Sequence, residues 1–156
     1  MKFGKLLAAA AAIMLAASLF GCSSGGEKVA RETAEKLLNC TAKQADDILS
    51  AASDTDGDDS ALVSRCTDKY GDVMTDDCIS ASIKTRALLR SALLAQSLES
   101  DVSCTDLKVE KRASDGKIYD FTATLTADSK TVAAVNGNMT VENGKVSRLT
   151  LNVKES

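Results

Sequence analysis

The spacing of apolar residues changes once along this chain, and that change constrains the fold more than any other feature. Before residue 100, apolar side chains recur every three or four positions, as on one face of a helix. From Val102 onward they alternate with polar residues, as in half-buried strands. Helices followed by strands predict an α+β domain of two layers. The alternation is clearest over residues 119–127, where polar residues separate Tyr119, Phe121, Ala123, Leu125 and Ala127.

Turn signals divide the second half of the chain into four strands. Asp115-Gly116, Asp128-Ser129-Lys130 and Asn143-Gly144 interrupt the alternation, and Asn-Gly is a strong hairpin signal. Because tight turns join antiparallel strands, we expect a four-stranded antiparallel meander. One face of this sheet is apolar and the other is rich in Thr and Asn. Gly137, in the middle of the third strand, predicts a bend or a bulge.

Helical spacing predicts three helical regions in the first half. The first covers residues 27–52, as two segments or as one bent helix, because Thr41-x-x-Gln44 has the form of a capping box. A short helix is predicted over residues 59–70. Thr75 is the predicted cap of a longer helix whose apolar positions continue to Leu98. These N-terminal helices are expected to pack on the apolar face of the sheet.

Two charged segments invite an ion-binding interpretation. If Asp54 is aligned with the first position of an EF-hand loop, Asp59 stands where Gly is needed and Arg65 where Glu is needed. We therefore interpret residues 54–59 as a solvated acidic turn whose last residue, Asp59, caps the next helix. A basic stripe on the longer helix, which fits either an anion site or a solvated face, consists of Lys84, Arg86 and Arg90.

The first 21 residues have the organisation of an export signal. Lys2 and Lys5 precede an apolar run from Leu6 to Phe20. As a helix, this run reaches ~22 Å, which is shorter than the ~30 Å hydrocarbon core of a bilayer. A short apolar run behind a basic start is typical of an export signal rather than of a permanent span. Cleavage by an ordinary signal peptidase after Ala16-Ala17-Ser18 is one option.

A second option follows from Leu19-Phe20-Gly21-Cys22, which resembles the lipobox of bacterial lipoproteins. The resemblance implies that diacylglycerol, carrying chains such as palmitate, is attached to the sulfur of Cys22 and that residues 1–21 are removed. Residues 22–26 would then be the lipidated cysteine and a short tether, and residues 27–154 a single α+β domain. The domain would face the extracytoplasmic side of the membrane, held by acyl chains that contribute ~0.8 kcal/mol per buried CH₂.

Charge and composition exclude several classes of function. The chain carries a net charge of −3, and loss of Lys2 and Lys5 with the leader makes the mature protein more negative by two charges. Nucleic-acid binding requires a basic footprint instead. The chain has no His, so Ser or Cys nucleophiles lack their usual base and metal sites lack their usual ligand. We predict no catalytic residues, no metal and no cofactor.

Besides Cys22, the chain has an even number of cysteines, which in an exported domain predicts two disulfides. The pairing that we prefer joins Cys66 to Cys78, between consecutive helices, and Cys40 to Cys104, between the first helical region and the sheet. Free thiols are one alternative. A zinc site with four thiolates is another, although no two of these cysteines form a close Cys-x₂-Cys pair.

The order of elements, together with the helical segment Leu37–Ile48, resembles the cystatin-like and NTF2-like superfamily over residues 27–154. NTF2-like members have a curved sheet and a cone-shaped pocket, and some use Asp and Tyr there for isomerase or dehydratase chemistry. In this chain Tyr119 and Asp120 are neighbours on a strand and point to opposite faces. We therefore expect a small binding or interaction module at the cell envelope, for a small ligand or a protein partner. An NTF2-like enzyme is the alternative.

The lipobox generates a direct prediction. Replacing Cys22 by Ala should abolish metabolic labelling with a palmitate analogue, because the acceptor sulfur is lost, and should move the protein out of the membrane fraction. Cys104→Ala is the matched control and should label as the natural chain does. A Cys22→Ala protein that still takes up the label would contradict lipidation at this residue.

Overall fold

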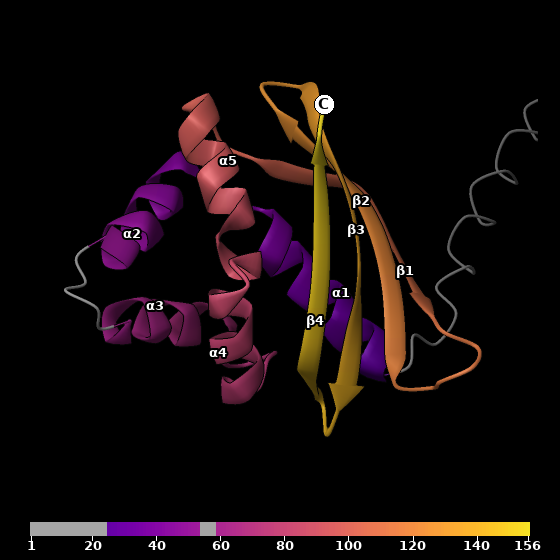
Figure 1. The fold of residues 1–156 in the computed structure, drawn as a ribbon. Coiled ribbons are helices and arrows are strands. Elements are labelled where there is room, and N and C mark those ends of the chain that lie inside the picture. Colours follow the sequence, from indigo (N-terminus) through magenta and orange to yellow (C-terminus); the bar gives the residue numbers. More distant parts are fainter. Residues whose placement is uncertain (1–24, 54–58) are drawn as a thin grey trace, which may run out of the picture.

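The computed structural model describes residues 25–53 and 59–156. In these residues helices precede strands, which confirms the predicted α+β class of two layers (Figure 1). The helices are α1 (Gly25–Leu38), α2 (Ala42–Ser53), α3 (Ser60–Tyr70), α4 (Asp76–Lys84), the 3₁₀-helix η1 (Ala87–Leu89) and α5 (Arg90–Leu98). The strands are β1 (Ser103–Lys111), β2 (Ile118–Ala127), β3 (Lys130–Glu142) and β4 (Lys145–Glu155).

The four strands form one antiparallel sheet in the order β1-β2-β3-β4, as the turn signals predicted. Asn143 and Gly144 join β3 to β4 with φ values of 50° and 77°. Positive φ at both central residues is the signature of the type I′ turn, which matches the twist of a hairpin. The predicted four-stranded antiparallel meander is therefore confirmed, and its last turn has the backbone conformation that Asn-Gly favours.

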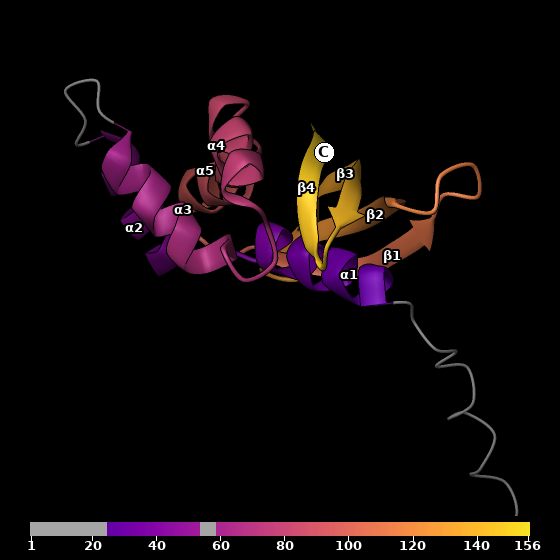
Figure 2. The same ribbon diagram turned by 90° about the horizontal axis from the view of Figure 1, so that it is seen from below.

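Helix α1 packs on the apolar face of the sheet and contacts all four strands. Its buried stripe includes Ala30, Ala34 and Leu37, which recur at helical spacing and are at most 1% exposed. Figure 2 shows α1 lying along one face of the sheet, while α2–α5 gather beside β4. The helical layer thus has two parts: α1 under the sheet, and a cluster of helices next to it.

The helix cluster is tied to α1 and to β4 by hydrogen bonds. The buried Ser91 hydroxyl donates to the Leu37 carbonyl oxygen at 2.8 Å, which fixes α5 against the end of α1. Near the start of β4, the Thr75 N–H donates to the Val146 carbonyl and the Val146 N–H donates to the Val73 carbonyl, at 3.0 and 2.8 Å. The segment before α4 therefore covers this part of the β4 edge.

Local side-chain bonds explain where several helices begin. The Thr41 N–H donates to Gln44 Oε1 at 3.1 Å and the Gln44 N–H donates to Thr41 Oγ1 at 3.2 Å, so the capping box is closed and α2 is a separate helix. Thr75 caps α4 as predicted, accepting from the Cys78 N–H. Asp59 precedes α3 but its side chain makes no capping bond. Its ψ of 7° departs from the extended backbone of a capping residue, so the predicted cap is wrong.

The predicted long helix after Thr75 is broken. The chain leaves α4 at Thr85, and Arg86 adopts a left-handed conformation with φ 59° and ψ 16°. The break buries three consecutive residues, Ala87 to Leu89, which are 7%, 2% and 8% exposed. A continuous amphipathic helix would turn one of three consecutive residues away from the core. Burial of this apolar triplet is therefore the physical reason for the break.

Gly137 marks a close approach rather than the bulge suggested by its sequence position. The pairing of β3 with β2 and β4 runs without a register shift through this residue. A Cβ atom at position 137 would lie 2.2 Å from the Thr150 carbonyl oxygen and 2.6 Å from Cζ of Phe121. Only a residue without a side chain leaves room for the Phe121 ring at this point. Of the described helices, none has the length and apolar character needed to cross a membrane.

Gly137→Ala should lower the free energy of unfolding by ~2–3 kcal/mol, because the new methyl group would displace Phe121 and strain the sheet backbone. Urea denaturation measures the change. Gly25→Ala is the matched control, since a Cβ there meets no atom within 4 Å, and it should leave stability nearly unchanged. Equal stability of the two variants would contradict the close packing at Gly137.

Candidate functional site

An open groove of about 920 Å³ lies within the helix cluster, lined by residues of α2–α5 and the segments that join them. This volume is near the upper end of the range for small-molecule pockets, ~300–1,000 Å³. Leu93, which lines this groove, is 40% exposed, while the other large apolar residues of the lining are buried. The apolar lining consists mainly of Leu49, Leu62, Ile83, Leu89 and Leu93.

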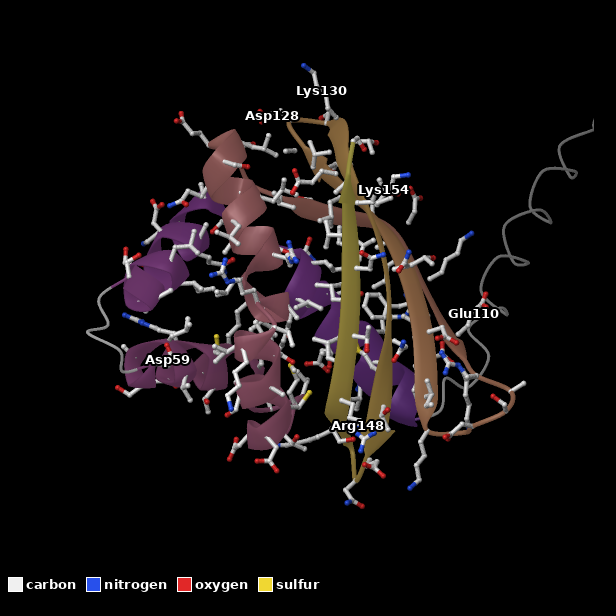
Figure 3. All side chains as sticks on the ribbon, in the orientation of Figure 1. Asp59, Glu110, Asp128, Lys130, Arg148 and Lys154 are labelled. Atoms are coloured by element: carbon white, nitrogen blue, oxygen red, sulfur yellow. The ribbon has the colours of Figure 1, made fainter. Side chains whose placement is uncertain are left out.

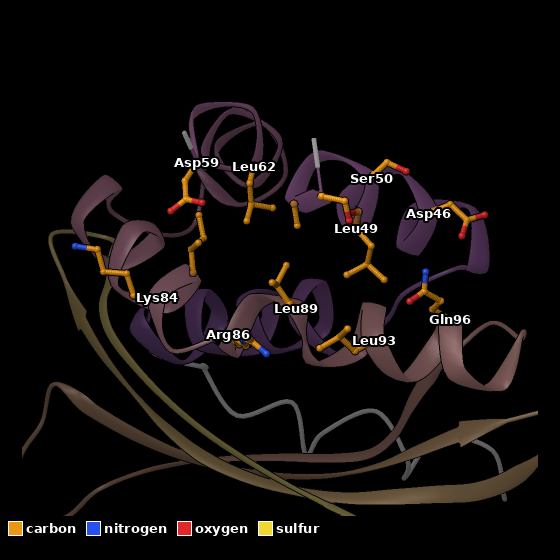
Figure 4. A pocket seen from close by; sticks show the side chains of 13 residues that line it. Asp46, Leu49, Ser50, Asp59, Leu62, Lys84, Arg86, Leu89, Leu93 and Gln96 are labelled. Carbon is orange, nitrogen blue, oxygen red and sulfur yellow. The ribbon is translucent and has the colours of Figure 1, made fainter. Parts of the chain in front are cut away.

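The break at Arg86 makes the groove possible. One side of the groove is formed by the end of α4, the left-handed turn and α5, and the other side by α2 and the start of α3. Because α4 and α5 are separate segments, Ile83 on the first and Leu93 on the second both line the same space. Figure 4 shows the leucine side chains converging from both sides.

The two sides of the groove carry opposite charges at their rims. Asp46 on α2 and Asp59 before α3 form an acidic rim, and Lys84 and Arg86 form a basic rim across the groove (Figure 4). Within the described residues, none of these four side chains takes part in an ion pair. The groove therefore has leucines in its lining and charges of opposite sign on its two sides.

The apolar face of the sheet contains no comparable space, because α1 fills it. Tyr119, Phe121 and Met139 are each at most 3% exposed and belong to one core cluster with Leu37 of α1. The groove therefore lies elsewhere than the cone-shaped pocket of NTF2-like proteins, which is formed by the curved sheet.

Tyr119 and Asp120, the pair considered for an enzyme, lie in different environments. The Tyr119 hydroxyl packs against α1, where a Cβ at Gly26 would come within 2.3 Å of its oxygen. Asp120 lies on the other face and accepts two hydrogen bonds from Arg112, one from Nε at 3.0 Å and one from Nη2. These bonds hold the pKa of the Asp120 carboxyl below its ordinary value. An ionised, paired carboxylate is a poor proton donor near neutral pH.

The polar face of the sheet is open to solvent, as its composition predicted. Figure 3 shows Glu110 on β1 and Arg148 and Lys154 on β4. Charges of both signs are interspersed among hydroxyl and amide groups, without a buried pocket floor of leucines like that of the groove. The exposed Thr and Asn residues on this face include Thr122, Asn136, Thr150 and Asn152.

All four cysteines of the domain are free thiols in the structure: Cys40, Cys66, Cys78 and Cys104. Burial raises the pKa of the Cys66 and Cys104 thiols to about 11, so in this reduced form they are protonated near neutral pH. Among the described residues no group of three or more His, Cys, Asp or Glu side chains is placed to hold a metal ion. The disulfide pairing stays a prediction, and Cys22 lies outside the described residues.

The sequence pointed to only part of the groove. Lys84 and Arg86 stood out as part of a basic stripe, and the structure places both on the groove while Arg90 is not part of its lining. Asp46, which also lines the groove, attracted no attention, because nothing local distinguishes it from other exposed acids. Leu93 looked like a core residue. Its exposure depends on how α5 packs against α2, which the helical spacing does not reveal.

Comparisons with known proteins add little to this geometry. The sequence matches no protein-family model and no curated protein. Among solved structures it is similar to the solution NMR structure of a de novo designed β-sheet protein. That similarity has 12% sequence identity and a TM-score of 0.43, over 84% of this chain and 90% of the designed one.

The Arg112–Asp120 pair generates a pH prediction. Arg112→Ala should raise the pKa of the Asp120 carboxyl toward ~3.9, because the two hydrogen bonds that favour the ionised form are lost. The pKa of the Asp120 carboxyl is lower in the folded than in the unfolded protein. The pair therefore adds to the free energy of unfolding at pH values above the unfolded-state pKa. This contribution is lost as the pH falls through the folded-state pKa.

Carboxyl-carbon NMR titration measures this change. Lys117→Ala is the control, since Lys117 donates to Glu142 instead at 3.1 Å, and it should leave the Asp120 titration unchanged. If Asp120 titrates at the same pH with and without Arg112, the pairing described above is wrong.

Proposed function

We propose that this protein is an exported, lipid-anchored interaction module that holds a protein partner in the groove of its helix cluster. The observation that carries the proposal is the combination of an apolar floor, with Leu93 at 40% exposure, and charged rims that have no ion-pair partners among the described residues. An open groove that combines an exposed leucine with charged side chains of both signs on its borders supports a role in binding.

The export signal at the N-terminus supports the part of this proposal that places the protein at the membrane. With lipid on Cys22, the three residues before α1 span at most ~11 Å, so the domain and its groove stay close to the membrane surface. A partner would then be another component of the cell envelope. Two disulfides among the four remaining cysteines belong to the same proposal, because the exported compartment is oxidising. Neither the placement of Tyr119 nor that of Asp120 adds support to the alternative of an NTF2-like enzyme.

The exposed leucines of α5 offer a matched pair of variants. Leu93 and Leu98 are 40% and 41% exposed, but only Leu93 lines the groove. A photo-crosslinking amino acid at Gln96, on the groove, should yield an adduct in cells that express the full-length lipoprotein. Leu93→Glu should reduce that adduct by at least tenfold, because it places a charge on the apolar floor. Leu98→Glu should leave it unchanged.

A crosslinker at Asn152, on the exposed polar face of the sheet, should give no corresponding adduct. The proposal fails if no adduct depends on Leu93, or if the Asn152 position captures the same partner as Gln96. Circular dichroism and thermal melting of the two leucine variants show whether each keeps the fold, so a loss of capture is assigned to the groove and not to unfolding.

A further inference from the structure

We infer that the open edge of β4, residues 148–155, binds an extended segment of a second protein. The segment adds to the four-stranded sheet as a fifth strand and carries acidic residues in alternation with apolar ones. Figure 1 shows α4 and α5 between β4 and α2, the helix on the far side of the groove, so the edge and the groove are separate surfaces. The inference therefore goes beyond the proposed function and is tested independently of it.

The chain itself already pairs with the start of this edge. Met74 forms a parallel bridge with Val146, and both backbone groups of Val146 are bonded to residues 73–75. Among the described residues, no backbone hydrogen bond joins residues 148–155 to any segment other than β3. The edge of β4 is thus paired at its start and open along the rest of its length.

The backbone groups that point to this edge belong to alternate residues. The Ser156 N–H donates to the Val132 carbonyl oxygen of β3 at 3.0 Å. Successive residues of an antiparallel pair direct their backbone groups toward and away from the partner strand in turn, so those of Leu151 and Val153 point away from β3. The pairing with β3 has no register shift over residues 148–155. An added strand would therefore meet a regular row of donors and acceptors.

The apolar side chains of this edge are only partly covered by the protein. Val135 and Met139, on the core face of β3, are 3% and 0% exposed. Leu149, Leu151 and Val153 lie on the same face of β4 and are half-buried at the margin of the core. Because neighbouring strands lie ~4.8 Å apart, an added strand would pack its own apolar side chains against these three and complete their burial.

The other edge of the sheet is protected against strand addition. The pairing of β1 with β2 is interrupted by a register shift. The Cys104 N–H donates to Asn39 Oδ1 at 2.8 Å, so one edge group is already bonded. Arg31 Nη1 donates to the Leu107 carbonyl oxygen at 3.4 Å, which occupies another. Irregular pairing and covered edge groups are the usual means of blocking an edge strand, and within the described residues the second half of β4 has neither.

Charge selects the segment that fits this edge. Arg148 and Lys154 are exposed on the polar face of β4 (Figure 3), and neither forms a salt bridge within the described part of the chain. An added strand with a carboxylate opposite each of them gains two cross-strand charge pairs.

The same two charges disfavour a second copy of this chain. In the longest antiparallel pairing of two β4 strands, centred on Leu151, Arg148 would lie opposite Lys154 of the other copy. Like charges directly opposite each other are destabilising. The occupant is therefore an acidic strand of a different protein.

Two matched peptides of eight residues test the charge preference. The first alternates Val with Glu and the second alternates Val with Lys. Fluorescence anisotropy with the full-length lipoprotein in detergent measures the binding of each. Physiological ionic strength screens charges farther away than ~8 Å, so the result reports the charges beside the peptide rather than the net charge of the protein. The Glu peptide should bind about fivefold more tightly than the Lys peptide. Equal binding, or tighter binding of the Lys peptide, overturns the inference.

Methylation of the peptide backbone tests strand addition itself. One version of the Glu peptide carries N-methyl groups on its valines, and another carries them on its glutamates. Because alternate residues of a strand direct their N–H groups to opposite sides, only one of the two sets can bond to β4. One version should therefore lose about tenfold in affinity while the other binds as the unmodified peptide does. If both versions bind equally, or if neither binds, the peptide does not add to the sheet.

A charge reversal on β4 should reverse the preference between the peptides. Arg148→Glu with Lys154→Glu should bind the Lys peptide more tightly than the Glu peptide. Lys84→Glu with Arg86→Glu, on the groove, is the matched control and should leave both affinities unchanged. Thermal melting followed by circular dichroism shows whether each double variant keeps the fold. An unchanged preference in a folded Arg148→Glu, Lys154→Glu protein contradicts binding at this edge.

Crosslinking in cells separates the edge from the groove. A crosslinker at Asn152, on β4, should capture a protein other than the one captured at Gln96, and Leu93→Glu should leave this adduct unchanged. Arg148→Glu with Lys154→Glu should remove it. An adduct between two copies of this chain, or no adduct at Asn152, overturns the inference about the edge and leaves the groove proposal standing. Absence of any Leu93-dependent adduct at Gln96 refutes the proposed function alone.

Discussion

The apolar face of the sheet is buried against α1, and the other elements take their places relative to this contact. The helix offers small side chains, Ala30 and Ala34, to a sheet surface that carries the larger Phe121 and Met139. Small residues on one side let the backbone of the helix approach the large residues on the other, and each large side chain buried contributes ~1.5–3 kcal/mol. The chain has few aromatic residues, so this close approach compensates for a limited supply of bulky groups. The same closeness explains why Gly26 faces the Tyr119 hydroxyl and why Gly137 lies under the ring of Phe121.

Because α1 occupies that face, the remaining helices cannot use it. They pack on one another beside β4, and hydrogen bonds such as that from Ser91 to the Leu37 carbonyl hold the cluster in place. The cluster nevertheless shares one continuous core with α1 and the sheet, because Leu49, Leu62 and Leu89 belong to the same group of buried residues as Phe121 and Met139. The groove lies where the helix cluster is left open within the described residues.

The sequence predicted the features that depend on neighbouring residues. The alternation from Val102 onward, the Asn143-Gly144 turn and the capping box of Thr41 and Gln44 each specify their structure through contacts a few residues long. The groove depends on distant contacts instead. Asp46 and Lys84 lie on different helices, and no local pattern indicates that they line the same groove. For the same reason the sequence distinguished neither the exposed Leu93 from the buried Leu94 nor the capping Thr75 from Asp59, whose side chain makes no capping bond.

The left-handed conformation of Arg86 is a local feature that also decides which distant residues line the groove. A non-glycine residue in this conformation costs ~1–2 kcal/mol, which burial of Ala87, Leu88 and Leu89 offsets. The break also changes the direction in which later residues point. On one continuous helix Ile83 and Leu89, six residues apart, would lie about 120° from each other around the axis, and they would not line the same cleft. With the turn at Arg86, both contribute to the groove and the Arg86 side chain stands at its rim. The conformation that buries the apolar triplet is therefore also the one that shapes the groove, so a substitution that straightened this segment would remove the groove together with the break.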